Sequence, residues 1–199
     1  MNPIKKAWHW LVTDWQWPQA ALFSGILTVI LLLGLLPKIG VLLFLICIQL
    51  PIYLIHQFEE HYKNRFRNLF NQLIGQGFEV LTPGAAFIIN SVFVWGTDLI
   101  SIYLAVFVTP FFGLIAAYLS VTNAIVHLLQ AIIMRCYNPG LATGLLFFLP
   151  LGGWCVYELA NRPGCTWHYH TLGIAIGILI HLGIIIHVRL RLGKLKAAH

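Results

Sequence analysis

Charged residues are scarce in this chain of 199 residues. They make up 9% of it, with 12 Lys and Arg and only 6 Asp and Glu, whereas an average soluble domain carries about 25%. Hydrophobic residues supply 59% of the chain, and the mean hydropathy is +0.83. This balance excludes a disordered chain and an ordinary cytosolic globule. It predicts a polytopic membrane protein that forms a single domain over residues 1–199.

Cysteine is scarce too, with only Cys47, Cys136, Cys155 and Cys165. The chain has no C-x-x-C pair and no Cys/His spacing typical of a zinc knuckle. So few cysteines also exclude a secreted scaffold held together by disulfides. A disulfide between Cys155 and Cys165 stays open, because both residues are expected near one side of the membrane and such bonds persist only on an oxidising side.

Six apolar runs are long enough to cross a membrane. A hydrocarbon core of about 30 Å needs roughly 17–25 helical residues, and in lipid only helices or closed barrels satisfy their own backbone hydrogen bonds. The expected fold class is therefore all-α, a polytopic membrane helix bundle of about six transmembrane helices. The expected spans are residues 20–36, 39–62, 83–108, 111–134, 141–158 and 171–188.

Two further segments have the features of a membrane surface. Residues 1–19 contain two Lys residues followed by four Trp residues. Because Trp prefers the level of the lipid headgroups, this stretch is expected to be interfacial. Residues 64–75 are expected to form an amphipathic surface helix. Its apolar face carries Phe66, Leu69, Phe70 and Leu73.

The basic residues lie between the apolar runs, which indicates a topology signal and not a nucleic-acid surface. With six spans both termini share one side, and that side carries ten Lys and Arg residues. The other side carries two, Lys38 and Arg162. Positive residues accumulate on the cytoplasmic side. We therefore expect both termini in the cytoplasm, an integral membrane location such as a bacterial inner membrane, and no nucleic-acid partner.

Polar side chains inside the spans form a layer. Each is costly in lipid and is by default a functional-site hypothesis. Counted inward at about 1.5 Å per residue, four of them fall roughly 10–12 Å from the cytoplasmic ends of their helices. These four residues are His56, Asn90, His127 and His181.

Helical phase adds neighbours to His56. At about 100° per residue, Glu59 and Glu60 flank its direction from one turn nearer the cytoplasm. Tyr53, one turn earlier, shares the same face. His61 is expected to point away from this face. The second span therefore presents an H-x-x-E-E motif to the layer.

The residues His56-Gln57-Phe58-Glu59-Glu60, followed by Asn123-Ala124-Ile125-Val126-His127, resemble the HXXEE family of small integral membrane proteins. The resemblance covers the chain from about residue 20 to residue 190. It implies a membrane protein suspected of enzymatic activity, without a settled reaction. It therefore supports a site, and the chemistry must come from the residue types.

Neutral imidazoles and carboxylates that converge in a dry cavity are ligands for Zn, Fe or Mn. We expect a divalent metal ion, zinc or iron, in this layer. The expected ligands are His56, Glu59, Glu60, His127 and His181. Asn90, Asn123 and Tyr53 are expected to orient a ligand or to hold a substrate.

Two chemistries fit these residues. With zinc, an activated water would attack the substrate and Glu59 or Glu60 would be the catalytic base. With two irons both glutamates would be ligands, although the chain lacks the paired Glu-x-x-His motifs of helix-bundle di-iron sites.

The function expected first is that of a membrane-embedded metalloenzyme. It would act from the cytoplasmic leaflet on a membrane lipid or another hydrophobic molecule, by hydrolysis with metal-activated water. A di-iron oxidoreductase on a hydrophobic substrate and a proton- or cation-binding transporter are the alternatives, and a haem protein with two axial histidines also stays open. Against a transporter, the chain has no inverted repeat and no paired broken helices.

Overall fold

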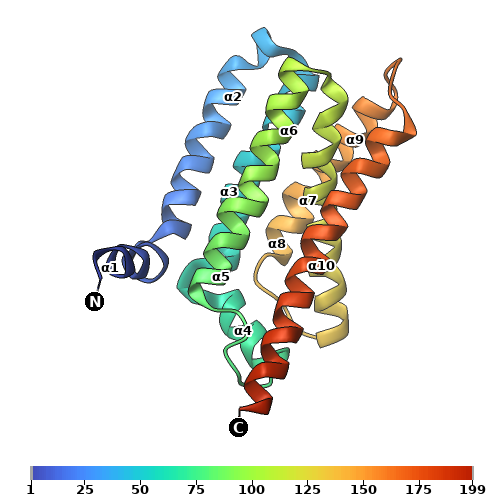
Figure 1. Cartoon of the computed structure of the whole chain (residues 1–199). Coiled ribbons are helices and arrows are strands. Elements are labelled where there is room, and N and C mark those ends of the chain that lie inside the picture. Colours follow the sequence, from blue (N-terminus) through green and yellow to red (C-terminus); the bar gives the residue numbers. More distant parts are fainter. Residues whose placement is uncertain (1, 199) are drawn as a thin grey trace.

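The computed structural model describes residues 2–198, which contain helices and loops and no strand (Figure 1). The α-helices are α1 Pro3–His9, α2 Trp17–Cys47, α3 Gln49–His61, α4 Arg65–Leu73, α5 Pro83–Ile88, α6 Gly96–Phe107, α7 Gly113–Met134, α8 Leu141–Thr143, α9 Gly153–Ala160 and α10 Trp167–Ala197. Short segments of other helix types connect them. Three are π-helical, η1 Trp10–Asp14, η3 Ile89–Trp95 and η5 Gly144–Gly152, and two are 3-10 turns, η2 Tyr62–Asn64 and η4 Pro110–Phe112. The predicted all-α membrane bundle is confirmed.

Within the described residues, five helical stretches are long and apolar enough to cross a membrane. They are Trp17–Cys47, Pro83–Phe107, Pro110–Met134, Leu141–Ala160 and Trp167–Ala197. The first stretch turns back at Gly40, whose φ of 75° and ψ of 165° break the helix. Its second arm continues into α3, which packs along the first arm. The chain therefore passes through the bundle six times, as the hydropathy pattern predicts.

α7 is the most buried of these stretches. α10 packs on α7 through two glycines spaced by one helical turn. A Cβ on Gly173 would come within 2.7 Å of the Leu114 carbonyl oxygen, and one on Gly177 within 2.9 Å of Thr122 Oγ1. Small residues at this spacing let transmembrane helices approach closely. This contact also fixes the position of His181, one turn beyond Gly177.

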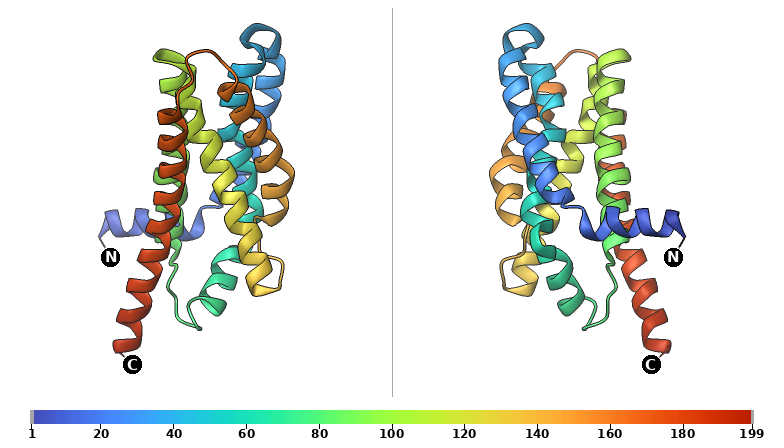
Figure 2. Two further views of the ribbon diagram at one scale, coloured as in Figure 1. Left: turned by 90° about the vertical axis from the view of Figure 1, so that its right-hand side faces the viewer. Right: turned by 90° about the vertical axis from the view of Figure 1, so that its left-hand side faces the viewer.

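The two termini lie at the same end of the bundle, together with α4 and the loop before α8 (Figure 1). The N-terminal segment, α1 and η1, lies across the bundle axis near that end (Figure 2). Trp8 and Trp15 pack edge-on against Phe87 there, with ring centroids 6.4 and 6.3 Å apart. The segment is largely exposed. Its interfacial location stays a prediction.

α4 is the helix expected over residues 64–75. It lies beneath the bundle at the end that carries the termini (Figure 1). Its Phe66 and Phe70 side chains face a cavity between the transmembrane helices, whereas Leu73 is 49% exposed. The aromatic half of the apolar face therefore covers the inside of the bundle. Whether Leu73 contacts lipid stays a prediction.

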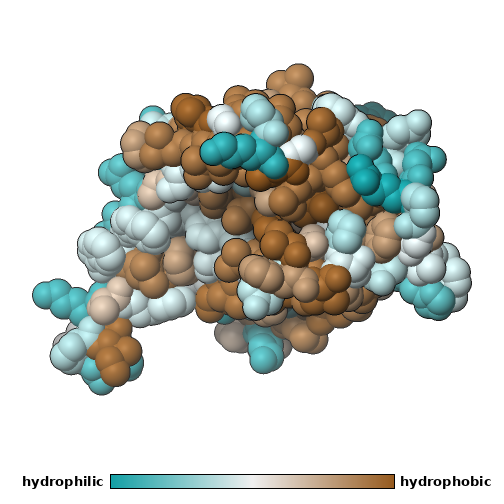
Figure 3. Space-filling view, turned by 90° about the horizontal axis from the view of Figure 1, so that it is seen from above, coloured by the Kyte–Doolittle hydropathy of each residue, from teal (hydrophilic) through white to brown (hydrophobic). Residues whose placement is uncertain are grey.

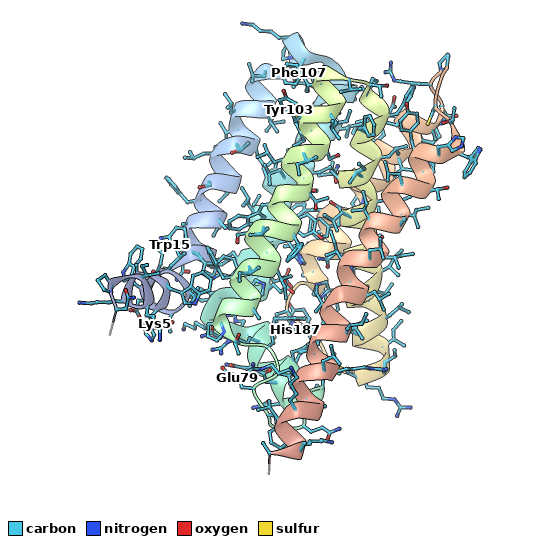
Figure 4. All side chains as sticks on the ribbon, in the orientation of Figure 1. Lys5, Trp15, Glu79, Tyr103, Phe107 and His187 are labelled. Atoms are coloured by element: carbon cyan, nitrogen blue, oxygen red, sulfur yellow. The ribbon has the colours of Figure 1, made fainter. Side chains whose placement is uncertain are left out.

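The outer surface is hydrophobic, as expected for a protein that contacts lipid. Seen from the end opposite the termini, hydrophobic residues fill the middle of the visible surface, and more hydrophilic residues lie toward both sides (Figure 3). Tyr103 and Phe107 on α6 are 60% and 70% exposed (Figure 4). All four cysteines are free in the described chain, so the disulfide between Cys155 and Cys165 is not formed.

Candidate metal centre

Three buried side chains form the centre of the candidate site: His56 and Glu60 from α3 and His127 from α7. Each offers one ligand atom, and these atoms lie within 4.8 Å of one another. His56 Nε2 is 3.6 Å from Glu60 Oε2, and His127 Nε2 is 3.8 Å from Glu60 Oε1. The i, i+4 spacing places His56 and Glu60 on one face of α3. The structure therefore brings together three of the five residues expected as ligands, from two separate motifs.

Asn138 orients the ring of His127. The Asn138 Nδ2 amide donates to the His127 carbonyl oxygen at 2.9 Å and to Gln130 Oε1 at 3.3 Å, which fixes the direction of the amide. Asn138 Oδ1 lies 2.7 Å from His127 Nδ1. Because an amide oxygen only accepts, Nδ1 carries the proton and donates. In the neutral ring, His127 Nε2 then carries the lone pair, and this atom lies 3.8 Å from Glu60 Oε1.

A relay of two side chains orients the ring of His56 in the same way. The Thr143 hydroxyl donates to Glu59 Oε2 at 2.5 Å, so its oxygen is free to accept from His56 Nδ1 at 2.7 Å. The proton of His56 is thus on Nδ1, and Nε2 carries a lone pair. That Nε2 atom is buried and has no hydrogen-bond partner among the described residues.

Two imidazole lone pairs and a carboxylate thus face one another in the interior of the protein. His56 Nε2 is a buried acceptor without a donor in the described part of the chain, which is costly. A cation between the three groups would satisfy it and would also bind the Glu60 carboxylate, which has His61 Nε2 at 3.2 Å. In a tetrahedral zinc site with bonds of about 2.0–2.1 Å, ligand atoms lie roughly 3.3–3.5 Å apart. The separations of 3.6 and 3.8 Å are close to this spacing. The donor set and its orientation fit a metal ion.

Gly140 closes the group from the side of the loop before α8. Its φ is 104°, in the left-handed region that favours glycine. A Cβ at this position would come within 2.5 Å of His127 Cε1 and 2.8 Å of His56 Cε1. The turn Asn138-Pro139-Gly140 therefore supplies both an orienting amide and a backbone that passes directly against the two ligand rings.

A cavity of about 100 Å³ adjoins Glu60 and His127 and is large enough for several water molecules. His181 lines this cavity but does not belong to the group of three. Its Nδ1 donates to the Gly177 carbonyl oxygen at 2.8 Å, which leaves Nε2 as an acceptor. The expected role of His181 as a fourth ligand stays a prediction.

The three residues expected to orient a ligand or hold a substrate all line the cavity. Asn123 Nδ2 donates to the Tyr53 hydroxyl at 2.8 Å, whereas Asn123 Oδ1 is buried and has no partner in the described chain. Asn90 Oδ1 accepts from Gln57 Nε2 at 2.7 Å, and its Nδ2 lies 2.8 Å from His61 Nε2. These positions agree with the expected layer; the roles stay predictions.

Glu59, expected as a ligand or base, lies outside the group of three. Its carboxylate accepts from the backbone amides of Ala142 and Thr143 at 3.1 and 2.8 Å, as well as from the Thr143 hydroxyl and the Tyr137 hydroxyl. Partial burial and the bond to Glu59 raise the pKa of Tyr137 to about 12, so the phenol keeps its proton at neutral pH. Glu59 therefore anchors the loop that orients His56.

The structure contradicts the expected direction of the His61 side chain. It is buried, its Nε2 lies 3.2 Å from Glu60 Oε2, and it lines the same cavity. His61 is the last residue of α3, where φ is −108°, so ideal helical phase no longer sets the direction of its side chain.

Asn138 and Thr143, which orient the histidines, were also not predicted from the sequence. They lie in or next to a loop, where the Asn-Pro-Gly turn is the only feature that the sequence reveals.

Comparison with known proteins identifies the family. The model of a family described as "Protein of unknown function with HXXEE motif" matches residues 47–155, more than half of the chain. The chain therefore belongs to the HXXEE family. No curated protein and no solved structure matches it.

Proposed function

We propose that this HXXEE-family protein is a membrane-embedded metalloenzyme in which His56, Glu60 and His127 bind one zinc ion. The observation that carries the proposal is the buried His56 Nε2 atom, which faces the Glu60 carboxylate and has no hydrogen-bond partner among residues 2–198. The orientation of both imidazoles supports it, because metal-bound histidines typically donate their other N–H to a neighbouring acceptor.

The ligand set favours zinc over two irons. Two imidazoles and one carboxylate are typical of catalytic zinc sites, which keep a position open for water. A helix-bundle di-iron site uses several carboxylates, whereas only Glu60 belongs to this group and Glu59 is bonded to the loop at Thr143. The cavity beside Glu60 and His127 offers the space for a water and a substrate.

The proposed reaction is hydrolysis of an amphiphilic substrate in the cytoplasmic leaflet. Bound zinc would lower the pKa of water toward neutrality. The hydroxyl part of the water adds to the electrophilic atom of the substrate, and the leaving group takes up a proton. His181 Nε2 is a free acceptor at the cavity and would receive the proton of the water. Asn123 Oδ1, which has no partner in the part of the chain that the structure describes, would accept from a polar group of the substrate.

The test is hydrolysis of long-chain fluorogenic esters and phosphates by the detergent-purified protein before and after metal removal. Chelation should abolish turnover, and added zinc should restore it. Glu60→Gln, which keeps the shape of the side chain, should be inactive. Turnover that persists after complete removal of the metal would exclude the proposal.

The variant His181→Ala distinguishes between two roles of His181, a proton acceptor and a zinc ligand. Since three ligands remain, this variant should keep its zinc. Its turnover should fall by about 10²–10⁴-fold, which is the usual contribution of general acid–base catalysis. His168→Ala, at an exposed position beside the opposite loop, is the control and should behave as wild type. Loss of zinc from His181→Ala would instead make His181 a ligand.

A further inference from the structure

A large apolar groove lies beside the candidate metal centre. Its volume is about 540 Å³, and α5, η3 and α6 line one side while α10 lines the other. This volume is within the range of about 300–1,000 Å³ that is usual for sites of small-molecule ligands. Phe93 and Leu179 line it and are 53% and 63% exposed, so the groove opens toward the lipid. The lining is almost wholly hydrophobic, with His187 and Thr97 as the polar members. His187 lies on α10 (Figure 4).

The groove and the metal cavity share a wall. Ile89 from η3 and Ile180 and Ile184 from α10 line both spaces. His181 lies between the two α10 residues and faces the metal cavity. A hydrocarbon chain in the groove would therefore bring its polar end to the side chains of the candidate site after a shift of these isoleucines.

A polar pocket of about 120 Å³ adjoins the metal cavity on another side, where His61 and Ala86 line both spaces. Two cations, Lys63 and Arg67, line this pocket together with one carboxylate, Asp14. Arg67 Nη1 pairs with Glu79 at 2.8 Å, but Arg67 Nε is buried and has no partner within the described chain.

We infer that the substrate is a single-chain anionic amphiphile. Its hydrocarbon tail lies in the groove, its anionic headgroup binds Lys63 and Arg67, and the part between them crosses the metal cavity. The three adjoining spaces, the two cations that line the polar pocket and the buried Arg67 Nε without a partner in the described chain carry this inference. It rests on the proposed function for the identity of the reacting site, but the binding mode can be measured without turnover.

The test uses a hexadecyl phosphate with a photoreactive diazirine on its chain, bound to the protein in phosphatidylcholine nanodiscs. Gly183 lines the groove and a Cβ there would meet nothing within 4 Å, so Gly183→Phe places its ring in the space of the groove. Gly34 on α2 is equally open and lines neither space, and Gly34→Phe is its matched control.

In the wild type, photolabelling should concentrate on residues 85–97 and 176–187. Gly183→Phe should reduce it about tenfold, equivalent to 1.4 kcal/mol of binding free energy, and Gly34→Phe should not. Labelling spread evenly over the lipid-facing helices, or unchanged in Gly183→Phe, would overturn the inference.

The headgroup is tested on the same samples. Arg67→Gln should weaken labelling by the alkyl phosphate but not by the matching uncharged alkyl alcohol. Glu79→Gln removes the partner of Arg67 but keeps the cation, so it should retain binding. Inorganic phosphate should compete only weakly with the labelled probe. Competition as strong as that of unlabelled hexadecyl phosphate would assign the pocket to free phosphate and would overturn the inference that the ligand is an amphiphile.

Zinc content measured in parallel separates the two proposals. Localised labelling that Gly183→Phe reduces in a protein without zinc would support the binding mode and reject the metalloenzyme. Zinc-dependent turnover with evenly spread labelling would support the enzyme and reject this substrate class.

Discussion

Three side chains outside the group of three ligands set the direction of the two histidine rings. Asn138 fixes the tautomer of His127, and the pair Glu59 and Thr143 fixes that of His56. A histidine presents a lone pair to a metal only when its other nitrogen carries the proton. At the scale of single residues, the site therefore depends on acceptors in the loop as much as on the ligands themselves.

Asn138→Ala should lower zinc affinity by about 10–100-fold, the usual cost of losing such an orienting partner. Asn138→Asp keeps an acceptor for His127 Nδ1 and should retain most of the affinity. Competition with a chromophoric chelator measures both variants. Equal affinities of Asn138→Ala and the wild type would show that the amide does not position His127.

Gly140→Ala should lose zinc, because its Cβ would occupy the space of the His127 and His56 rings. The left-handed backbone adds strain of about 1–3 kcal/mol. Gly164→Ala is the matched control, since its φ is 91° and its Cβ would meet Phe111 at an ordinary 3.4 Å. Thermal unfolding should show a loss of stability in both variants, and only Gly140→Ala should lack zinc. Retention of zinc in Gly140→Ala would contradict the close approach of the Gly140 backbone to the rings of His127 and His56.

Among the elements, α4 covers the site with aromatic side chains. Phe66 packs against His127 with ring centroids 5.8 Å apart, and Phe70 lines the same cavity. Amphipathic spacing alone predicted the helix. It did not predict which partner its apolar face would meet, because lipid and a bundle interior select the same hydrophobic residues.

Replacing Phe66 by Ala should speed the release of zinc to a chelator, because the covering ring no longer excludes water from His127. Leu73→Ala, at an exposed position on the same helix, should leave the rate unchanged. Stopped-flow measurement of zinc release compares the two. The same acceleration in both variants would mean that α4 acts through general stability or lipid contact.

For the whole molecule, long apolar runs were sufficient to predict the spans, because a helix must be hydrophobic over the thickness of the bilayer. Depth along these spans then brought His56, Glu60 and His127 together. The direction in which individual side chains point was harder to predict. His61 lies at a helix end and Asn138 in a turn, and in both places the tertiary contacts, rather than a helical period, decide where a side chain points.

The distribution of basic residues predicts that both termini are cytoplasmic, and the structure places both at one end of the bundle (Figure 1). Reporter fusions to each terminus, active only on one side of the membrane, should both report the cytoplasm. A loop reporter at Arg162 should report the opposite side. A terminus on the outer side would move the proposed metal centre out of the cytoplasmic leaflet.

The central claim is that His56, Glu60 and His127 share one ion. Elemental analysis of protein purified without chelators tests it most directly, and we expect about one zinc per chain. Each of His56→Ala, Glu60→Gln and His127→Ala should abolish the zinc, and double variants should lose nothing further, because ligands of one ion act as a unit. His168→Ala should keep it. Protein without bound metal, or zinc that survives the loss of any one of these three residues, would contradict the account.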